Sequence, residues 1–129
     1  MNVGSWQTQL RKGAAELVVL SLLRGRALYG LELLDRAGGS GGIVSDGTLY
    51  PLLARLEREG KLAAEWVLAE EAKIPRKYYR LTAEGEALVA EMQRLWRDFS
   101  AFVDAAIEER KDETAPARPR RSVARRARA

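Results

Sequence analysis

Four leucines within residues 45–60 constrain the fold of this chain more than any other feature. They are Leu49, Leu52, Leu53 and Leu56. Their i, i+3, i+4 and i+7 spacing is that of one buried stripe along an α-helix. The opposite side of this helix is small, polar and basic, and is formed by Gly47, Thr48, Tyr50, Pro51, Ala54, Arg55 and Arg58. Because the major groove of DNA is about 12 Å wide and admits one helix, such a face predicts a groove-binding helix.

Two β-favouring segments follow this helix, at residues 62–68 and 76–82. Both contain aromatic and aliphatic side chains, and the second is also basic. Residues 69–75 are predicted to form the loop between them, since Pro75 cannot donate a hydrogen bond within a strand ladder. A helix followed by a basic hairpin predicts a winged helix-turn-helix, which is a mainly α fold with a small β-hairpin.

Three more helices are predicted around this motif. Residues 10–24 are apolar on most sides, which favours a buried helix, and residues 28–37 form a shorter second helix. The glycine-rich residues 38–42 form a loop before the third helix, whose predicted N-cap is Ser45. A long last helix begins after Thr82, which is its predicted N-cap. Its heptad seam consists of Leu88, Met92, Leu95, Phe99, Phe102 and Ala106, flanked by Val89, Trp96, Val103 and Ile107.

The predicted seam is too long for one small domain to cover, so the last helix predicts a homodimer. We therefore expect a winged helix-turn-helix DNA-binding domain at residues 1–82 and a dimerisation helix at residues 83–111. Residues 112–129 contain prolines and arginines without apolar periodicity, which predicts a disordered basic tail.

The net charge of +4 is unevenly distributed along the chain. Residues 111–129 hold seven of the 22 basic and two of the 18 acidic residues, so this segment carries +5 and residues 1–110 carry −1. The basic character of the chain is thus mainly a property of its last segment. Binding of the folded part to nucleic acid must depend on local charge distribution, because its net charge is close to zero.

The chain contains neither histidine nor cysteine. These residues include the commonest general base, the thiolate nucleophile and the usual ligands of transition metals. No catalytic residue, metal site or cofactor is therefore predicted, and an enzyme is disfavoured. No apolar run approaches the ~18 residues of a membrane span, and residues 1–13 lack the apolar stretch of a signal peptide. The expected location is the cytoplasm, without a membrane partner.

Four stretches of the sequence resemble the PadR family of bacterial transcriptional regulators. They are LRKG at 10–13, LYG at 28–30, GTLYPLLARLEREG at 47–60 and RKYYRLTAEG at 76–85. The resemblance implies a dimeric winged-helix repressor whose third helix enters the major groove and whose last helix dimerises. It also implies a small aromatic effector. A two-fold symmetric dimer of this kind is expected to read an inverted repeat in double-stranded DNA. The acidic residues Glu70 and Glu71 depart from what a phosphate-facing hairpin loop would favour.

Ten candidate DNA-contacting residues follow from the predicted third helix, the hairpin and the resemblance. They are Tyr29, Ser45, Gly47, Thr48, Tyr50, Arg55, Arg58, Lys73, Arg76 and Lys77. Seven of them have an alternative role. The two arginines of the helix could pair with Glu57 and Glu59, the two tyrosines could pack in the core, and the three hairpin bases could be ordinary solvated charges.

The last helix supplies the candidate interface and ligand residues. The predicted dimer interface contains Leu88, Met92, Leu95, Trp96, Phe99, Phe102 and Val103. The candidate effector site contains Trp6, Met92, Trp96 and Phe99, whose planar and polarisable side chains suit a flat aromatic molecule. Simple interface packing explains the same residues. The alternative function for the whole chain is a winged-helix module that docks other proteins without binding DNA.

Overall fold

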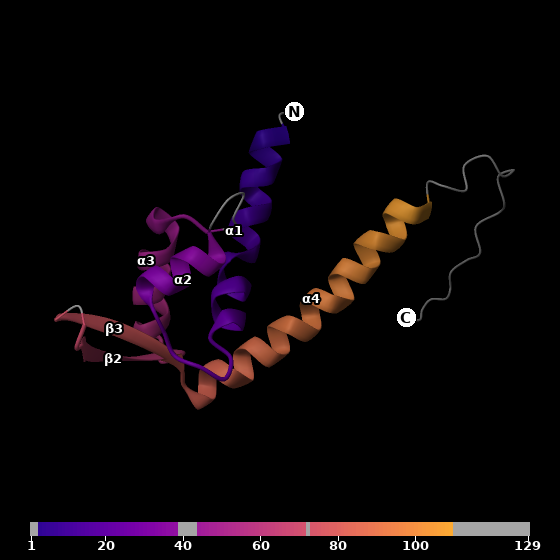
Figure 1. Cartoon of the computed structure of the whole chain (residues 1–129). Helices are drawn as coiled ribbons and strands as arrows, with labels where there is room; N and C mark the ends of the chain where they lie inside the picture. The colour runs from indigo at the N-terminus through magenta and orange to yellow at the C-terminus, as the bar shows by residue number, and fades with distance from the viewer. Residues whose placement is uncertain (1–2, 39–43, 72, 110–129) are drawn as a thin grey trace, which may run out of the picture. The chain divides into compact units, whose positions relative to one another are not determined.

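The computed structural model describes residues 3–38, 44–71 and 73–109 (Figure 1). The elements are α1 (Val3–Leu22), β1 (Leu28–Tyr29), α2 (Gly30–Ala37), α3 (Asp46–Arg58), β2 (Leu62–Ala69), β3 (Ile74–Leu81) and α4 (Ala83–Glu109). Most of the predicted glycine-rich loop and the whole predicted basic tail lie outside the described residues. The chain divides into two compact units, one ending at Arg94 and the other beginning at Leu95, and each is described by itself.

The buried leucine stripe of α3 is confirmed. All four leucines are buried, and three of them are fully inaccessible to solvent. Ser45 is the N-cap residue as predicted, and its carbonyl accepts hydrogen bonds from the amides of Thr48 and Leu49. Its side chain makes no capping bond to the backbone. Pro51 lies inside the helix, where it removes one backbone donor without ending the helix.

The boundaries predicted for α1 and α2 were wrong. Helix α1 begins at Val3 and not at residue 10, because its first turns are exposed and carry no core periodicity that a sequence pattern could reveal. Leu28 and Tyr29 form the short strand β1, although they were expected to be helical. They pair with Tyr79 and Tyr78 of β3, and this long-range pairing overrides the local helical pattern.

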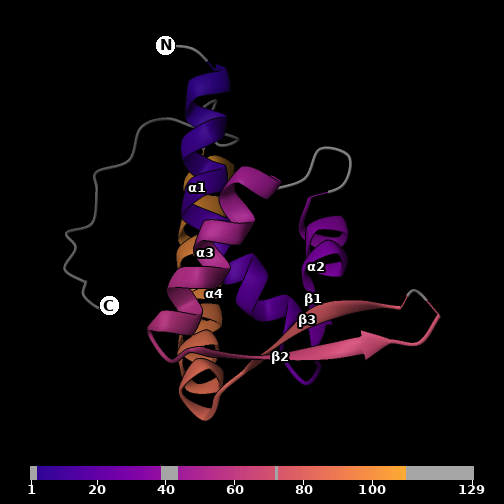
Figure 2. The same ribbon diagram turned by 90° about the vertical axis from the view of Figure 1, so that its left-hand side faces the viewer.

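The three strands form an antiparallel sheet in the order β1-β3-β2 (Figure 2). Strand β2 ends at Ala69 and not at residue 68, and β3 begins and ends earlier than the predicted 76–82. It therefore includes Pro75, which lies opposite Leu68 in the register. The expectation that Pro75 belongs to the loop was therefore wrong. Since β1 pairs only with Tyr78 and Tyr79, one side of β3 is open at Pro75 and needs no donor there.

The core of the first unit joins all its elements. Its buried residues come from α1, β1, α2, α3, the strands and the beginning of α4, where Val89 is fully buried. Leu88 and Met92, which were assigned to the dimer seam, are partly buried against this core. Arg24 donates a hydrogen bond of 2.7 Å to Gln93, which links the segment after α1 to α4.

The start of α4 is fixed by contacts with the turn before β2. Thr82 is the predicted N-cap, and its hydroxyl oxygen accepts a 3.0 Å bond from the amide of Gly85. The same hydroxyl lies 2.7 Å from the carbonyl oxygen of Gly60. A Cβ atom added at Gly85 would lie 2.1 Å from the carbonyl oxygen of Lys61. Glycine is therefore required at this position, because any side chain would overlap a backbone atom.

The second unit is the later part of α4. From Leu95 onward its large apolar side chains are all exposed in the single chain, and they are Leu95, Trp96, Phe99, Phe102, Val103 and Ile107. The ring centroids of Trp96 and Phe99 are 6.4 Å apart at an interplanar angle of 52°. Nothing within the described unit covers this stripe, so the predicted seam is present as an unburied apolar surface.

Candidate nucleic-acid interface

Helix α3 presents two chemically distinct sides. Its leucines are buried, whereas Gly47, Thr48, Ala54 and Arg58 are exposed on the other side. The exposed side is narrow, because three of these four side chains are small. This arrangement allows the helix to lie in a groove without disturbing the core that holds it.

The N-terminus of α3 adds hydroxyl groups to this surface. Ser45 and Thr48 are both exposed, and the Ser45 hydroxyl donates to the Thr48 Oγ1 atom at 3.4 Å. These hydroxyls can exchange this long mutual contact for bonds to phosphate oxygens. The structure thus brings together the candidates at the start of α3.

The two arginines of α3 differ in their surroundings. Arg55 donates to Glu16 of α1 at 3.0 Å and to Glu59 at 3.2 Å. The hydrogen bond to Glu16 raises the pKa of the Arg55 guanidinium above its usual value. Arg58 is exposed and has no carboxylate partner among the described residues. The alternative of arginine–glutamate pairing therefore describes Arg55, and Arg58 remains available to a ligand.

Tyr29 is located where β1, β3 and α2 meet. Its ring lies edge-on to Tyr78 at 5.4 Å, and the Arg76 guanidinium lies 4.5 Å from its centroid. The Tyr29 amide donates to the Glu32 carboxylate at 3.1 Å. Tyr29 is partly buried. Its ring packs against neighbouring side chains, and its hydroxyl group can still contact a ligand.

Lys77 connects the hairpin to α3. Its ammonium group lies 3.3 Å from the Glu57 carboxylate and within 6 Å of the ring centroids of Trp66 and Tyr79. Burial raises the pKa of the Tyr79 hydroxyl, so this group stays neutral at physiological pH. Lys77 is thus a structural cation, which an anionic ligand can reach only in competition with Glu57.

The tip of the hairpin has mixed charge. Lys73 is exposed and adopts a left-handed backbone with φ of 55°. Glu70 and Glu71 are exposed close to it in sequence. The tip therefore offers one base and two acids, which makes it a weaker phosphate contact than the arginine at position 76.

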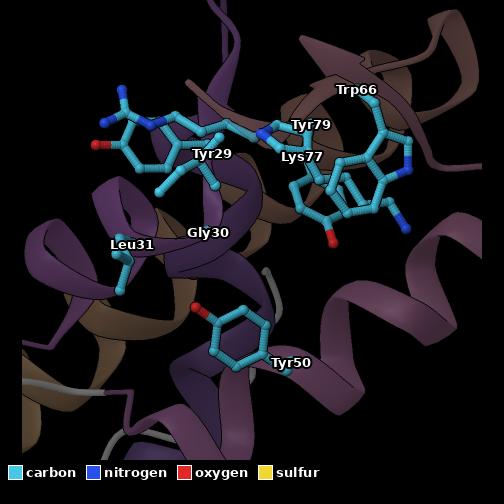
Figure 3. A pocket seen from close by; sticks show the side chains of 10 residues that line it. Tyr29, Gly30, Leu31, Tyr50, Trp66, Lys77 and Tyr79 are labelled. Atoms are coloured by element: carbon cyan, nitrogen blue, oxygen red, sulfur yellow. The ribbon is translucent and has the colours of Figure 1, made fainter. Parts of the chain in front are cut away.

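Tyr50 and Gly30 form a contact that sequence reasoning missed. A Cβ atom added at Gly30 would lie 2.9 Å from Cε1 of Tyr50, so the absence of a side chain at Gly30 makes room for this ring. Tyr50 remains 42% exposed, and it lines a hollow of about 430 Å³ between α2, α3 and the hairpin (Figure 3). Glu16 and Trp66 were also missed, because their roles depend on contacts between distant segments. Glu57 was considered as a partner of the α3 arginines, but it pairs with Lys77 of the hairpin.

The candidate effector residues are distributed over both units. Trp96 and Phe99 lie together in the second unit, as expected from their spacing. Met92 is half-buried against the core of the first unit, and Trp6 is exposed on α1. Among the described residues no group of three or more acidic side chains could hold a metal ion. In the described part of the chain no helix is both long and apolar enough to cross a membrane.

Three helices followed by a β-hairpin, with a third helix that is buried on one side and free on the other, define a winged helix-turn-helix protein. Residues 19–91 match the model of the transcriptional regulator PadR-like family. The transcriptional regulator Rv3488 of Mycobacterium tuberculosis is 33% identical over 95 residues, which cover 74% of this chain and 87% of that protein.

Solved structures give the same result. A PadR family transcriptional regulator from Eggerthella lenta is 38% identical, with a TM-score of 0.70 over 82% of this chain and 92% of that one. A PadR-like transcriptional regulator from Bacillus cereus is 29% identical, with a TM-score of 0.66 over 77% of this chain and 96% of that one. The chain belongs to the PadR-like family of transcriptional regulators, and it is a DNA-binding regulator and not an enzyme.

Proposed function

We propose that this regulator is a repressor that binds an inverted-repeat operator as a homodimer, with one α3 helix in each of two major-groove segments. The observation that carries this proposal is the two-sided α3, whose exposed face is separate from the leucines that hold the helix in the core. A docking module would not need a narrow, basic outer face. The family assignment also favours a regulator over the docking alternative.

Phosphate contacts are assigned to the residues around the groove-binding helix. The hydroxyls of Ser45 and Thr48 and the Arg76 guanidinium are exposed or half-exposed and can donate to phosphate oxygens. Tyr29 and Tyr50 supply two further hydroxyls. These contacts position the helix, whereas Arg58 is proposed to read a base edge, because bidentate arginine–guanine pairs are the commonest specific contact.

Dimerisation is assigned to the exposed stripe of α4. An unburied row of large apolar side chains is costly in water, and a second copy of the same helix would cover it. The predicted interface residues Leu95, Trp96, Phe99, Phe102 and Val103 all lie on this stripe. Leu88 and Met92 can contribute only their outer edges, because the core of their own unit covers the rest.

We further propose that a flat aromatic effector binds at the dimer seam beside Trp96. The later part of α4 offers the indole of Trp96 and the ring of Phe99 with few polar groups nearby. A ligand that binds two dimer geometries with different affinity shifts the spacing of the two α3 helices and so weakens operator binding.

The DNA-binding proposal is tested by selecting operators from a random pool of duplexes with the purified full chain. The expected result is an inverted repeat whose half-site centres are about 10 bp apart, which is one helical turn. Recovery of no enriched sequence, with binding that depends only on salt, would contradict operator recognition.

Arg58→Ala is expected to weaken binding to the selected operator by about 1–3 kcal/mol, if its guanidinium contacts a base. Fluorescence anisotropy with labelled duplexes measures the change. Arg36→Ala, which removes an exposed arginine at the end of α2, is the matched control and should bind as the unmodified protein does. Arg55→Ala should cost less affinity than Arg58→Ala, because Arg55 is already paired with Glu16 and Glu59. Equal losses for the variants at 36 and 58 would show that only overall charge matters.

Trp96→Ala is expected to abolish binding of planar aromatic compounds at the seam while leaving the dimer intact. The reason is that alanine removes the stacking surface and retains the remaining apolar row. Isothermal titration of candidate aromatics and light scattering measure the two properties. Aromatic binding that survives in this variant would place the effector elsewhere.

A further inference from the structure

Polar side chains at and just after the end of α1 hold the first turns of α4, which lie beside them (Figure 1). Gln93 uses both ends of its side-chain amide, because Nε2 donates to the Ser21 hydroxyl oxygen at 3.0 Å and Oε1 accepts from Arg24 Nη1 at 2.7 Å. The Arg24 Nε atom also lies 3.7 Å from the Glu86 carboxylate. We call Ser21, Arg24, Glu86 and Gln93 the polar clamp, and all four belong to the first compact unit.

The polar clamp restrains the direction of α4. Glu86 and Gln93 are one heptad apart, so they lie on the same side of the helix and are separated by about 10 Å along its axis. A single contact would act as a pivot, whereas two contacts from one guanidinium, two turns apart, restrain how the helix is tilted. The Arg24 amide also donates to the Ser21 carbonyl oxygen at 3.2 Å, which joins the two clamp members on the α1 side.

The apolar contacts of α4 cannot supply this restraint alone. Val89 is fully buried and Met92 is packed against the core, but apolar burial has no preferred direction. Hydrogen bonds have a narrow range of length and angle. The side chains of Arg24 and Glu86 are each 43% exposed, so their ion pair adds little stability. The placement of α4 therefore explains the polar clamp better than stability does.

The polar clamp lies where a small change in tilt has a large effect. The first unit ends at Arg94, directly after Gln93. Helix α4 continues to Glu109, which is roughly 24 Å further at 1.5 Å per residue. A tilt of about 10° at Gln93 would displace the end of the helix by about 4 Å. This displacement exceeds the rise of about 3.4 Å for one base pair of DNA.

We propose that Gln93 is a positioning residue, which through Ser21 and Arg24 sets the direction in which α4 leaves the DNA-binding unit and thereby the half-site spacing that the dimer accepts. The proposal rests on the proposed function, because it requires that α4 dimerises and that α3 binds DNA. Gln93 belongs neither to the exposed side of α3 nor to the apolar stripe of α4, so its effect on recognition is indirect.

The test uses variants of the full chain that remove or retain the bonds of Gln93. Gln93→Met removes both bonds and keeps a similar length and helix propensity. Gln93→Glu is the conservative variant, because its carboxylate can accept from Arg24 and from the Ser21 hydroxyl. Ser21→Ala removes one of the two bonds. Glu91→Gln is the control, since it removes an ion pair with Arg94 that lies within α4 itself. Circular dichroism and sedimentation velocity show whether each variant is folded and dimeric.

Spacing selectivity is measured with the selected operator and with derivatives in which one base pair is added or removed between the half-sites. The unmodified chain, Gln93→Glu and Glu91→Gln should bind the derivatives about tenfold more weakly than the operator, because both half-sites are no longer reached together. In Gln93→Met this difference should fall to about threefold or less, with an intermediate value for Ser21→Ala. Binding to a single half-site should not change in any variant. A purely structural defect would weaken binding to all duplexes equally. Full selectivity in folded, dimeric Gln93→Met and Ser21→Ala, or none in the unmodified chain, would overturn the proposal.

The direction of α4 is measured without DNA by electron paramagnetic resonance. Because the chain contains no cysteine, spin labels attach only at Arg36→Cys in α2 and Asp104→Cys in α4. Dilution with unlabelled protein leaves mainly the distance within one chain, whether or not the chain dimerises. The distance distribution should be narrow in the unmodified clamp and in Gln93→Glu, and clearly broader in Gln93→Met. An unchanged distribution in Gln93→Met would overturn the proposal.

The two measurements distinguish this proposal from the proposed function. A protein that selects an inverted repeat, and whose spacing selectivity does not depend on Gln93, would retain the proposed function and lose the role of the clamp. A distance distribution that broadens in Gln93→Met, in a protein that selects no operator, would support the clamp as the restraint on α4 and contradict the proposed function.

Discussion

Gly85→Ala is expected to lower the free energy of unfolding by about 2 kcal/mol or more, because the added methyl group overlaps a backbone atom. The Cβ position at Gly85 is 2.1 Å from the carbonyl oxygen of Lys61, and a backbone carbonyl cannot rotate away as a flexible side chain can. Alanine normally stabilises a helix relative to glycine by up to about 1 kcal/mol. A loss of stability in Gly85→Ala would therefore show that the added methyl group overlaps its neighbour. Urea unfolding followed by circular dichroism at a fixed protein concentration measures the difference.

Gly13→Ala supplies the matched control for this experiment. Gly13 is also helical, but a Cβ atom added there meets nothing within 4 Å. The same substitution should therefore leave stability unchanged or increase it by up to about 1 kcal/mol. If both variants gain stability, the close packing of α4 against the turn before β2 is not present in solution.

Phe99→Asp is expected to convert the proposed dimer to monomers at micromolar concentration. Phe99 is 59% exposed in the single chain and lies in the middle of the apolar stripe of α4. In a dimer the substitution would place a carboxylate from each copy in the seam, and burying an unpaired charge costs several kcal/mol. Sedimentation velocity measures the change in mass. Operator binding should fall with it, because two linked α3 helices are needed to read both half-sites.

Arg97→Asp introduces the same carboxylate on the outer side of the same helix. Position 97 lies off the stripe formed by Leu95, Phe99 and Phe102, and its side chain is exposed. This variant should remain a dimer. A wild-type protein that sediments as a monomer, or a Phe99→Asp protein that sediments as a dimer, would remove the basis for the proposed interface.

Features of the fold that depend on residues close together in the sequence could be predicted from it. The leucine stripe of α3 and the N-cap of α4 at Thr82 are local patterns, and both are confirmed. The strand β1 could not be predicted in this way, because Leu28 and Tyr29 are extended only through pairing with β3. The first turns of α1 were missed for a related reason, since an exposed helix carries no buried periodicity.

Some features of the candidate site could likewise be predicted from local sequence, and others could not. Which residues lie on the outer side of α3 follows from helical spacing, and the exposed positions of Thr48 and Arg58 agree with it. That Arg55 pairs with Glu16 could not be inferred, because the two residues are 39 positions apart. The heptad seam had a similar ambiguity. Periodicity shows that Leu88 is on an apolar stripe, but it does not show that the domain's own core covers this residue.

The two-sidedness of α3 has a consequence for how regulators of this kind can diverge. Thr48, Ala54 and Arg58 contribute nothing to the buried leucine row, so substitutions there can change the preferred DNA sequence at little cost in stability. Arg55 is different, because its bond to Glu16 also joins α3 to α1. A gene duplicate could therefore acquire a new operator through the first three positions while its fold is retained, whereas a change at Arg55 would alter recognition and helix packing together.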